Sequence, residues 1–189
     1  CEDPNGGCVF WSYGSEPAEL LASGDVVMST GWNGRFFNSI VGENLPIKQM
    51  WDAQIIDYEY FALVKDSPRK RAAMEVLKQM TSAEGLAYSS KYLAYSPWRK
   101  SSMKIIEQNE PWFKDGKTKM SKFLPISTQN TKNYILIDPF FWGNNGSEIA
   151  TNWDYMKSNI EPNTLLAKNE FNKDIISENK EINLKLEND

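Results

Sequence analysis

The chain has 189 residues, enough for one or two domains, and its 41% apolar and 24% charged residues are typical of a globular protein. A net charge of −4, from 21 basic and 25 acidic residues, argues against nucleic acid or an anionic membrane as the main partner. The chain contains no histidine, which excludes Ser-His and Cys-His nucleophile pairs and most zinc sites.

The N-terminal quarter of the chain predicts short strands alternating with helices. Ser15 can cap a helix that stops at Gly24, and residues 35–41 form a second helical stretch. Short apolar runs predict three strands. They cover residues 9–11, 26–30 and 47–51.

Two cysteines lie at the start of the chain, in a loop rich in proline and glycine. Cys1 and Cys8 would form a disulfide in an oxidising compartment or remain free thiols in the cytosol, and we favour the disulfide. Residue 1 is a cysteine and no signal peptide is present, so we expect a processed product or a fragment. No apolar run approaches the ~18 residues that span a bilayer, and we expect no membrane insertion.

Residues 55–64 have the length and the aromatic and β-branched content of a strand. Side chains alternate along a strand, so Asp57 and Glu59 share one face, which becomes apolar at Phe61 and Leu63. Two residues along a strand span roughly 6.5–7 Å. Neighbouring carboxylates beside an apolar wall resist ionising unless a cation lies between them. The pattern therefore predicts a cation site.

The spacing of the two acids leaves three interpretations open. Asp57 and Glu59 would suit the acid and base of an inverting glycosidase, although such pairs normally face each other across a cleft. They could instead both face solvent. In the third interpretation they bind an ammonium group, with aromatic rings adding cation–π contact. Trp32, between glycines that allow close backbone approach, is a candidate wall of that site.

Three helices are predicted after this strand. Pro68 suits the first position of a helix, and residues 73–80 carry an apolar stripe at helical spacing. A capping box that begins the stretch 81–93 predicts a second helix, and residues 99–108 predict a third. Strands followed by helices in this rhythm favour an α/β domain.

The C-terminal third is less regular. Residues 111–131 are lysine-rich and loop-like, and residues 134–137 are apolar. Ser147 can cap a last helix, and residues 161–189 form a polar, charged tail. The side chains predicted to face inward on that helix are Ile149, Ala150, Trp153 and Met156.

Several segments, in order over roughly residues 9 to 160, resemble the periplasmic substrate-binding proteins of polyamine-type ABC transporters. Each is weak alone, whereas the ordered set is fairly specific. The matching segments are residues 17–28, 32–35, 51–52, 57–62, 95–97 and 141–144.

This resemblance implies an α/β, type II periplasmic-binding-protein-like fold with two lobes, of which the chain carries the C-terminal part. The implied division is 1–57 in lobe 2, 58–103 in lobe 1, and 104–160 in lobe 2, followed by the 161–189 tail. The 55–64 strand would then run through the hinge. A chain without most of lobe 1 should expose apolar surface along residues 58–103 and self-associate, aggregate or bind ligand poorly.

The resemblance also implies a function. The chain would be a periplasmic solute-binding protein that captures a polyamine-like amine, such as putrescine or spermidine, and delivers it to an ABC transporter permease. It would be no enzyme and would need no cofactor or metal. Alternatives are another solute (an amine, an opine-like compound or a metal chelate), a carbohydrate-active enzyme using Asp57 and Glu59, or a plain interaction domain.

The family's ligand contacts carry over unevenly. Its acid for the ligand amine falls on Glu59, longer than the aspartate typical there, with Asp57 assisting. Trp32 matches an aromatic wall, and Tyr95 matches a hydroxyl-bearing aromatic residue at the cleft. The family's amide contact falls on a glycine, Gly143, which leaves its neighbour Trp142 as a candidate and the ligand open.

Overall fold

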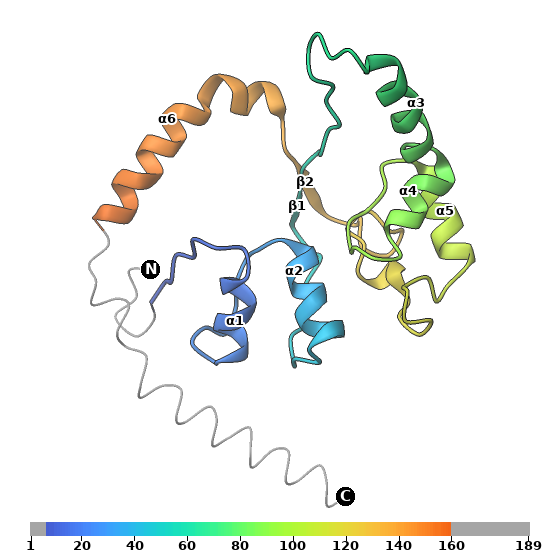
Figure 1. The fold of residues 1–189 in the computed structure, drawn as a ribbon. Coiled ribbons are helices and arrows are strands. Elements are labelled where there is room, and N and C mark those ends of the chain that lie inside the picture. The colour runs from blue at the N-terminus through green and yellow to red at the C-terminus, as the bar shows by residue number, and fades with distance from the viewer. Residues whose placement is uncertain (1–6, 160–189) are drawn as a thin grey trace, which may run out of the picture. The chain divides into compact units, whose positions relative to one another are not determined.

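The computed structural model describes residues 7–159 (Figure 1). The predicted tail and Cys1 lie outside these residues, whereas Cys8 is disulfide-bonded, as expected. The chain divides into two compact units, one formed by Cys1–Gly31 with Pro139–Asp189 and the other by Trp32–Asp138. The boundaries predicted for the two lobes stay a prediction.

The first unit contains helix α1 (Glu16–Ala22) and helix α6 (Pro139–Ser158). Ser15 occupies the N-cap of α1 as predicted, but its side chain makes no capping hydrogen bond. Instead, the Glu16 carboxylate accepts the backbone N–H of Tyr13 at 3.1 Å. The helix ends before Gly24, whose φ of 76° suits a residue without a Cβ.

The strands predicted over residues 9–11 and 26–30 are absent from the structure. A strand needs a neighbouring strand to bond its backbone, and residues 9–11 lack one among the described residues. Val26 donates its N–H to the Leu20 carbonyl at 3.3 Å, which turns the chain back onto α1. Phe10 packs edge-on against Trp153 of α6, with 5.5 Å between ring centroids.

Helix α6 begins at Pro139, earlier than the predicted start at Ser147. Proline is tolerated there because the first helical N–H has no partner within the helix. The inward orientation predicted for its apolar side chains is wrong, since α6 has no buried residue and Trp153 is 48% exposed.

The second unit begins with α2 (Asn33–Phe37), which continues into a π-helical turn, η1 (Asn38–Gly42). This confirms the helix predicted over residues 35–41. The strand predicted over 47–51 is absent. The backbone N–H of Ile47 bonds to the Leu45 carbonyl at 2.8 Å, which bends the chain locally.

The described residues contain one two-stranded parallel sheet, made of β1 (Gln54–Ile56) and β2 (Tyr134–Leu136). Ile55 lies opposite Ile135 in the register. The strand predicted over residues 55–64 is therefore wrong in length. Its propensity continues to Val64, but among the described residues no second strand accompanies it beyond Ile56.

Three helices follow, as predicted: α3 (Lys70–Met80), α4 (Ala83–Ser89) and α5 (Lys100–Gln108). The N-cap of α4 is Ser82 rather than Thr81, and its hydroxyl accepts the Gly85 N–H at 3.0 Å. The Thr81 hydroxyl instead donates to the Leu77 carbonyl at 2.8 Å, at the end of α3. Helix α4 ends at Ser89, short of the predicted residue 93.

The core of the second unit lies between α2, α4, α5 and the loop that follows α5. Its loop residues Met120 and Leu124 are fully buried, and Met120 opens a short 3-10 helix, η2 (Met120–Lys122). The lysine-rich loop over residues 111–131 thus contributes large side chains to the core. The cluster consists of Phe37, Ala87, Ala94, Met103, Ile106, Met120 and Leu124.

A carboxylate organises this loop. Glu110 accepts three backbone N–H groups, those of Trp112 at 3.1 Å, Met120 at 3.0 Å and Ser121 at 2.7 Å. Buried backbone donors need such partners. Glu110 therefore replaces the strand or helix bonds that the loop lacks.

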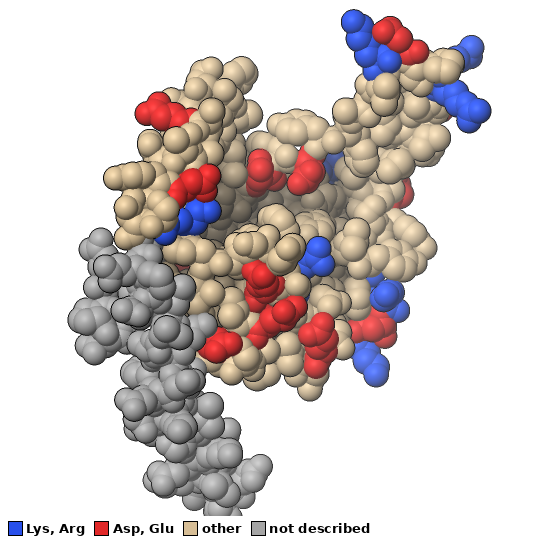
Figure 2. Space-filling view, turned by 60° about the vertical axis from the view of Figure 1, so that its left-hand side comes forward, with Lys and Arg blue, Asp and Glu red and all other residues tan. Residues whose placement is uncertain are grey.

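Large apolar side chains are exposed along residues 58–103, as expected. Figure 2 shows wide uncharged areas between the charged side chains of the face it presents. In the part of the chain that the structure describes, no helix is long and apolar enough to cross a membrane. The exposed residues are Tyr60, Phe61, Val64, Met74, Val76, Met80, Tyr88, Tyr92, Leu93, Tyr95 and Trp98.

Candidate functional site

The structure brings two of the predicted ligand-binding residues onto adjacent segments. The ring of Tyr95 lies directly over Gly34, where an added Cβ would be only 2.7 Å from the ring carbon Cζ. The side-chain amide of Asn33 donates to the Ala94 carbonyl, across 61 positions of sequence. Trp32, which begins the same segment, therefore lies on a stretch of chain held against the stretch that carries Tyr95.

Hydrogen bonds to backbone carbonyl groups hold both segments in place. The Gln49 side chain donates to the Asn33 carbonyl at 2.9 Å, and the Ser90 hydroxyl donates to the Tyr95 carbonyl at 3.0 Å. Trp32 is 56% exposed and Tyr95 is 49% exposed. About half of each aromatic side chain is thus accessible to a ligand, while the backbone beneath it is held in place.

The two acids lie just beyond the end of β1. Asp57 is exposed, and its carboxylate accepts the N–H of Tyr58 at 2.7 Å. Glu59 is exposed and makes no hydrogen bond or ion pair within residues 7–159. The ring of Tyr58, which lies between the two acids in the sequence, stacks on the ring of Trp98, with 4.0 Å between the centroids. The expected alternation of acids and tyrosines is therefore retained in part, without a paired strand.

Trp142 lies on α6, in the other unit. It is 45% exposed and packs edge-on against Phe141, with 5.8 Å between ring centroids. Its predicted place in the ligand site stays a prediction.

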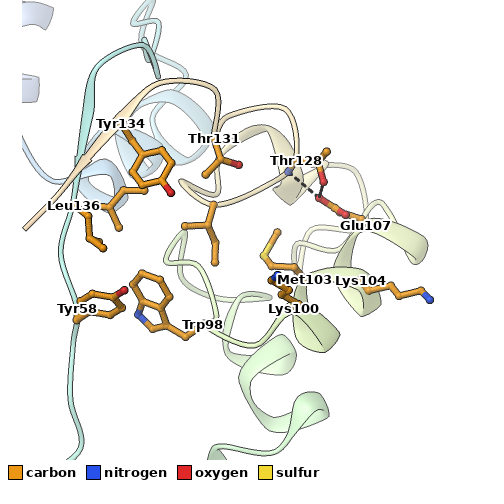
Figure 3. A pocket seen from close by; sticks show the side chains of 12 residues that line it. Tyr58, Trp98, Lys100, Met103, Lys104, Glu107, Thr128, Thr131, Tyr134 and Leu136 are labelled. Carbon is orange, nitrogen blue, oxygen red and sulfur yellow. Dashed lines mark hydrogen bonds between the residues drawn. The ribbon is translucent and has the colours of Figure 1, made fainter.

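The second unit also contains a pocket of about 430 Å³, which sequence reasoning did not identify (Figure 3). None of the predicted site residues lines it. Tyr58, Trp98 and Tyr134 supply aromatic walls. The remaining lining residues are Ile56, Lys100, Met103, Lys104, Glu107, Ile126, Thr128, Thr131 and Leu136.

One rim of this pocket is charged. Lys100, Lys104 and Glu107 recur at helical spacing on α5, a signal that was readable from the sequence. The Glu107 carboxylate accepts both the backbone N–H and the hydroxyl of Thr128, each at 3.1 Å. In Figure 3 the Lys104 side chain extends away from the other labelled residues. The pocket thus presents aromatic surface with both signs of charge at its rim.

The resolved pKa shifts fall outside the predicted site. The hydrogen bond between the hydroxyls of Tyr88 and Tyr92, 3.0 Å long, raises the pKa of Tyr92. Hydrogen bonds from the side chain and backbone of Thr118 and the backbone of Lys117 lower the pKa of Asp115. Among the described residues, no group of three or more acidic or cysteine side chains is placed to hold a metal ion.

Comparison with known proteins gives a matching family model and a distant relative. Residues 3–120 match the model of the family described as bacterial extracellular solute-binding protein. The chain is also 26% identical, over 140 residues, to the gamma-aminobutyric acid-binding protein of Pseudomonas aeruginosa. That alignment covers 74% of this chain and 37% of the relative, so the chain spans little more than a third of the relative's length.

These matches agree with the solute-binding character implied by the resemblance, and they indicate a binding protein rather than an enzyme. The family location is extracytoplasmic. Neither match addresses specificity for polyamines. Because the family model covers more than half of the sequence, the chain belongs to the bacterial extracellular solute-binding proteins.

Proposed function

We propose that the chain serves in the periplasm as a solute-binding protein for a small primary amine of the putrescine and spermidine class, which it delivers to an ABC transporter permease. The supporting observation is the contact between the segment carrying Trp32 and the segment carrying Tyr95, made through Gly34. It supplies two accessible aromatic side chains on a fixed backbone. The type II two-lobe fold implied by the resemblance is part of this proposal.

An alkylammonium ion needs an anion to replace its hydration and apolar surface for its methylene groups. Glu59 is exposed and makes no ion pair within the described residues, so its carboxylate is available to an ammonium group. Asp57 would assist, although one of its oxygens already bonds to Tyr58. Trp32 and Tyr95 would pack the methylene groups and face the charge. Excluding water on closure would strengthen these interactions.

A second candidate ligand is an ω-amino acid of the γ-aminobutyrate type, favoured by the relative from Pseudomonas aeruginosa. Such a ligand also carries an ammonium group on a short methylene chain, but its other end is a carboxylate. A carboxylate needs a cation, and Lys100 lines the pocket beside Trp98. Both ligand classes therefore need an anion for the ammonium group, and only the second also needs a cation such as Lys100.

Titration calorimetry of the 189-residue chain with putrescine, spermidine and γ-aminobutyrate tests the proposal. We expect a polyamine to bind and Glu59→Gln to weaken it at least about tenfold, because hydrogen bonds to charged groups contribute about 1.5–3 kcal/mol. Lys100→Met is the matched control and should leave polyamine binding unchanged.

The opposite pattern identifies the second candidate. Binding of γ-aminobutyrate alone, weakened by Lys100→Met, would replace the polyamine assignment. If neither polyamine binds, or if Glu59→Gln binds them as well as the wild type, the assignment to polyamines is wrong. Circular dichroism of each variant checks that the fold is kept.

A further inference from the structure

The pocket drawn in Figure 3, here called the Trp98 pocket, has walls that are bonded to one another within the second unit. Strands β1 and β2 contribute Ile56 and Leu136, which lie opposite each other in the register. On α5 the Glu107 carboxylate accepts the backbone N–H of Thr128 at 3.1 Å, which joins this helix to the loop that forms another wall.

Two further hydrogen bonds hold that loop, residues 126–131, in place. The Gln54 side chain donates to the Asn130 carbonyl at 2.8 Å, which joins the loop to β1. The backbone N–H of Ile126 bonds to the Ser96 hydroxyl at 3.1 Å, two positions before Trp98. The pocket is therefore formed in the absence of a ligand, as is usual for sites that bind small molecules.

The interior of the Trp98 pocket is apolar and aromatic. Ile56 and Met103 are each only 6% exposed. The Trp98 ring stacks on Tyr58 and is still 42% exposed, and Tyr134 is 48% exposed. An aromatic ring placed here would lose contact with water and gain stacking contacts. The volume of about 430 Å³ lies within the roughly 300–1,000 Å³ of small-molecule pockets.

The charges that line the pocket favour an anion. Lys100 and Lys104 make no ion pair within residues 7–159. Glu107 is the one acidic residue of the lining, and one of its oxygens accepts both hydrogen bonds from Thr128. Two ammonium groups thus stand against one carboxylate. Because the Lys104 side chain extends away in Figure 3, Lys100 is the better placed of the two to contact a ligand.

We propose that the Trp98 pocket binds a small carboxylate that carries an aromatic ring, at a site separate from that of the amine. The ring packs against Trp98 and Tyr134, and the carboxylate accepts a hydrogen bond from the Lys100 ammonium group. A cationic amine is disfavoured here, because its charge would lie near two lysines. A carboxylate without a ring would leave the aromatic walls in water.

Titration calorimetry of the 189-residue chain with phenylacetate tests the ligand class. Phenylacetamide is the matched probe, since it has the same shape without the charge, and acetate lacks the ring. We expect phenylacetate to bind and acetate to give no measurable heat. Phenylacetamide should bind about three- to tenfold more weakly, because it loses a charge-assisted hydrogen bond at an exposed rim.

Three variants test the charged residues. Lys100→Met should weaken phenylacetate binding about three- to tenfold and leave phenylacetamide binding nearly unchanged. Lys78→Met, on α3 and outside the pocket lining, is the control that removes the same charge, and it should change neither affinity. Glu107→Gln keeps an oxygen that can accept the Thr128 hydrogen bonds but removes the negative charge. It should tighten phenylacetate binding about two- to threefold.

Absence of phenylacetate binding overturns the proposal, and so does phenylacetamide binding as tight as that of phenylacetate. Equal losses in Lys100→Met and Lys78→Met would do the same, because they would show a general effect of charge. Circular dichroism checks the fold of each variant, and all three substituted side chains are exposed.

A fourth variant separates this proposal from the proposed function. Glu59→Gln should leave phenylacetate binding unchanged, since Glu59 does not line the Trp98 pocket. A loss of phenylacetate binding in Glu59→Gln would place this ligand in the amine site and overturn the proposal. The phenylacetate titrations need no amine, so carboxylate binding and amine binding can fail or succeed separately.

Discussion

Helices α3 and α5 begin from the same sequence signal and end in opposite environments. Both carry apolar residues at helical spacing, although only the prediction of α3 used that spacing. Helix α5 buries Met103 and Ile106 against α4 and the loop that follows, whereas α3 has no buried residue. On α3, Val76 is 56% exposed and Met74 is 51% exposed.

The difference teaches what an amphipathic pattern can specify. It fixes which side of a helix is apolar, because that depends only on the helical repeat. It does not fix what covers that side, which depends on segments far away in sequence. For α5 the cover comes from Ala87, Met120 and Leu124, while the described residues provide no comparable cover for α3.

The largest expected effect is the difference in unfolding free energy between a substitution on α5 and one on α3. Ile106→Ala should lower the free energy of unfolding by about 2–5 kcal/mol, because it leaves a cavity at a fully buried position. Val76→Ala on α3 is the matched control and should change it by no more than about 0.5 kcal/mol. Urea denaturation measures both. Equal losses would mean that the α3 stripe is covered in solution.

A smaller effect compares two glutamates. Glu110→Gln should cost about 1–3 kcal/mol, since the amide nitrogen cannot accept the backbone N–H groups now bonded to the carboxylate. Glu59→Gln removes no such bond and should leave the unfolding free energy unchanged. A stability loss at Glu59 similar to that at Glu110 would show that Glu59 has a structural partner in solution.

The smallest effect is a pH dependence from Asp115. Hydrogen bonds from the Thr118 side chain, and from the Thr118 and Lys117 backbone, lower the pKa of this carboxyl in the folded state. Its contribution to stability is therefore complete above about pH 4 and is lost as the pH falls through the lowered value. Asp115→Asn should destabilise the chain slightly at neutral pH and not at the acid end. A difference independent of pH would contradict this assignment.

Local sequence signals predicted the helices well and the strands poorly. Helices α2 to α5 were predicted because hydrophobic spacing, capping residues and stop signals lie within one short stretch. The strand predictions at 9–11, 26–30 and 47–51 were wrong because a strand forms only with a partner, which local propensity does not specify.

The core residues of the 111–131 loop were not predicted from the sequence, for a related reason. Met120 and Leu124 follow no helical or strand period, and Glu110 holds the loop by bonds to its backbone.

The candidate site was predictable in part. Trp32 and Tyr95 were selected separately, and their segments meet through Gly34 and Asn33. The pocket beside Trp98 was missed because its walls come from Tyr58, α5 and Tyr134, which nothing in the sequence connects. The roles of Asp57, Glu59 and Trp142 remain predictions for the binding experiments to test.

The contact between Gly34 and Tyr95 has an evolutionary consequence. A Cβ at position 34 would meet the far end of the Tyr95 ring, so any residue other than glycine there requires that ring to move or to be replaced by a smaller side chain. Among homologues that retain this packing, the two positions should therefore change together, with a larger residue at 34 accompanied by a smaller one at 95. In a library randomised at position 34 alone, glycine should be enriched among the functional clones. Randomising both positions should also recover functional clones with a larger residue at position 34 and a smaller one at position 95.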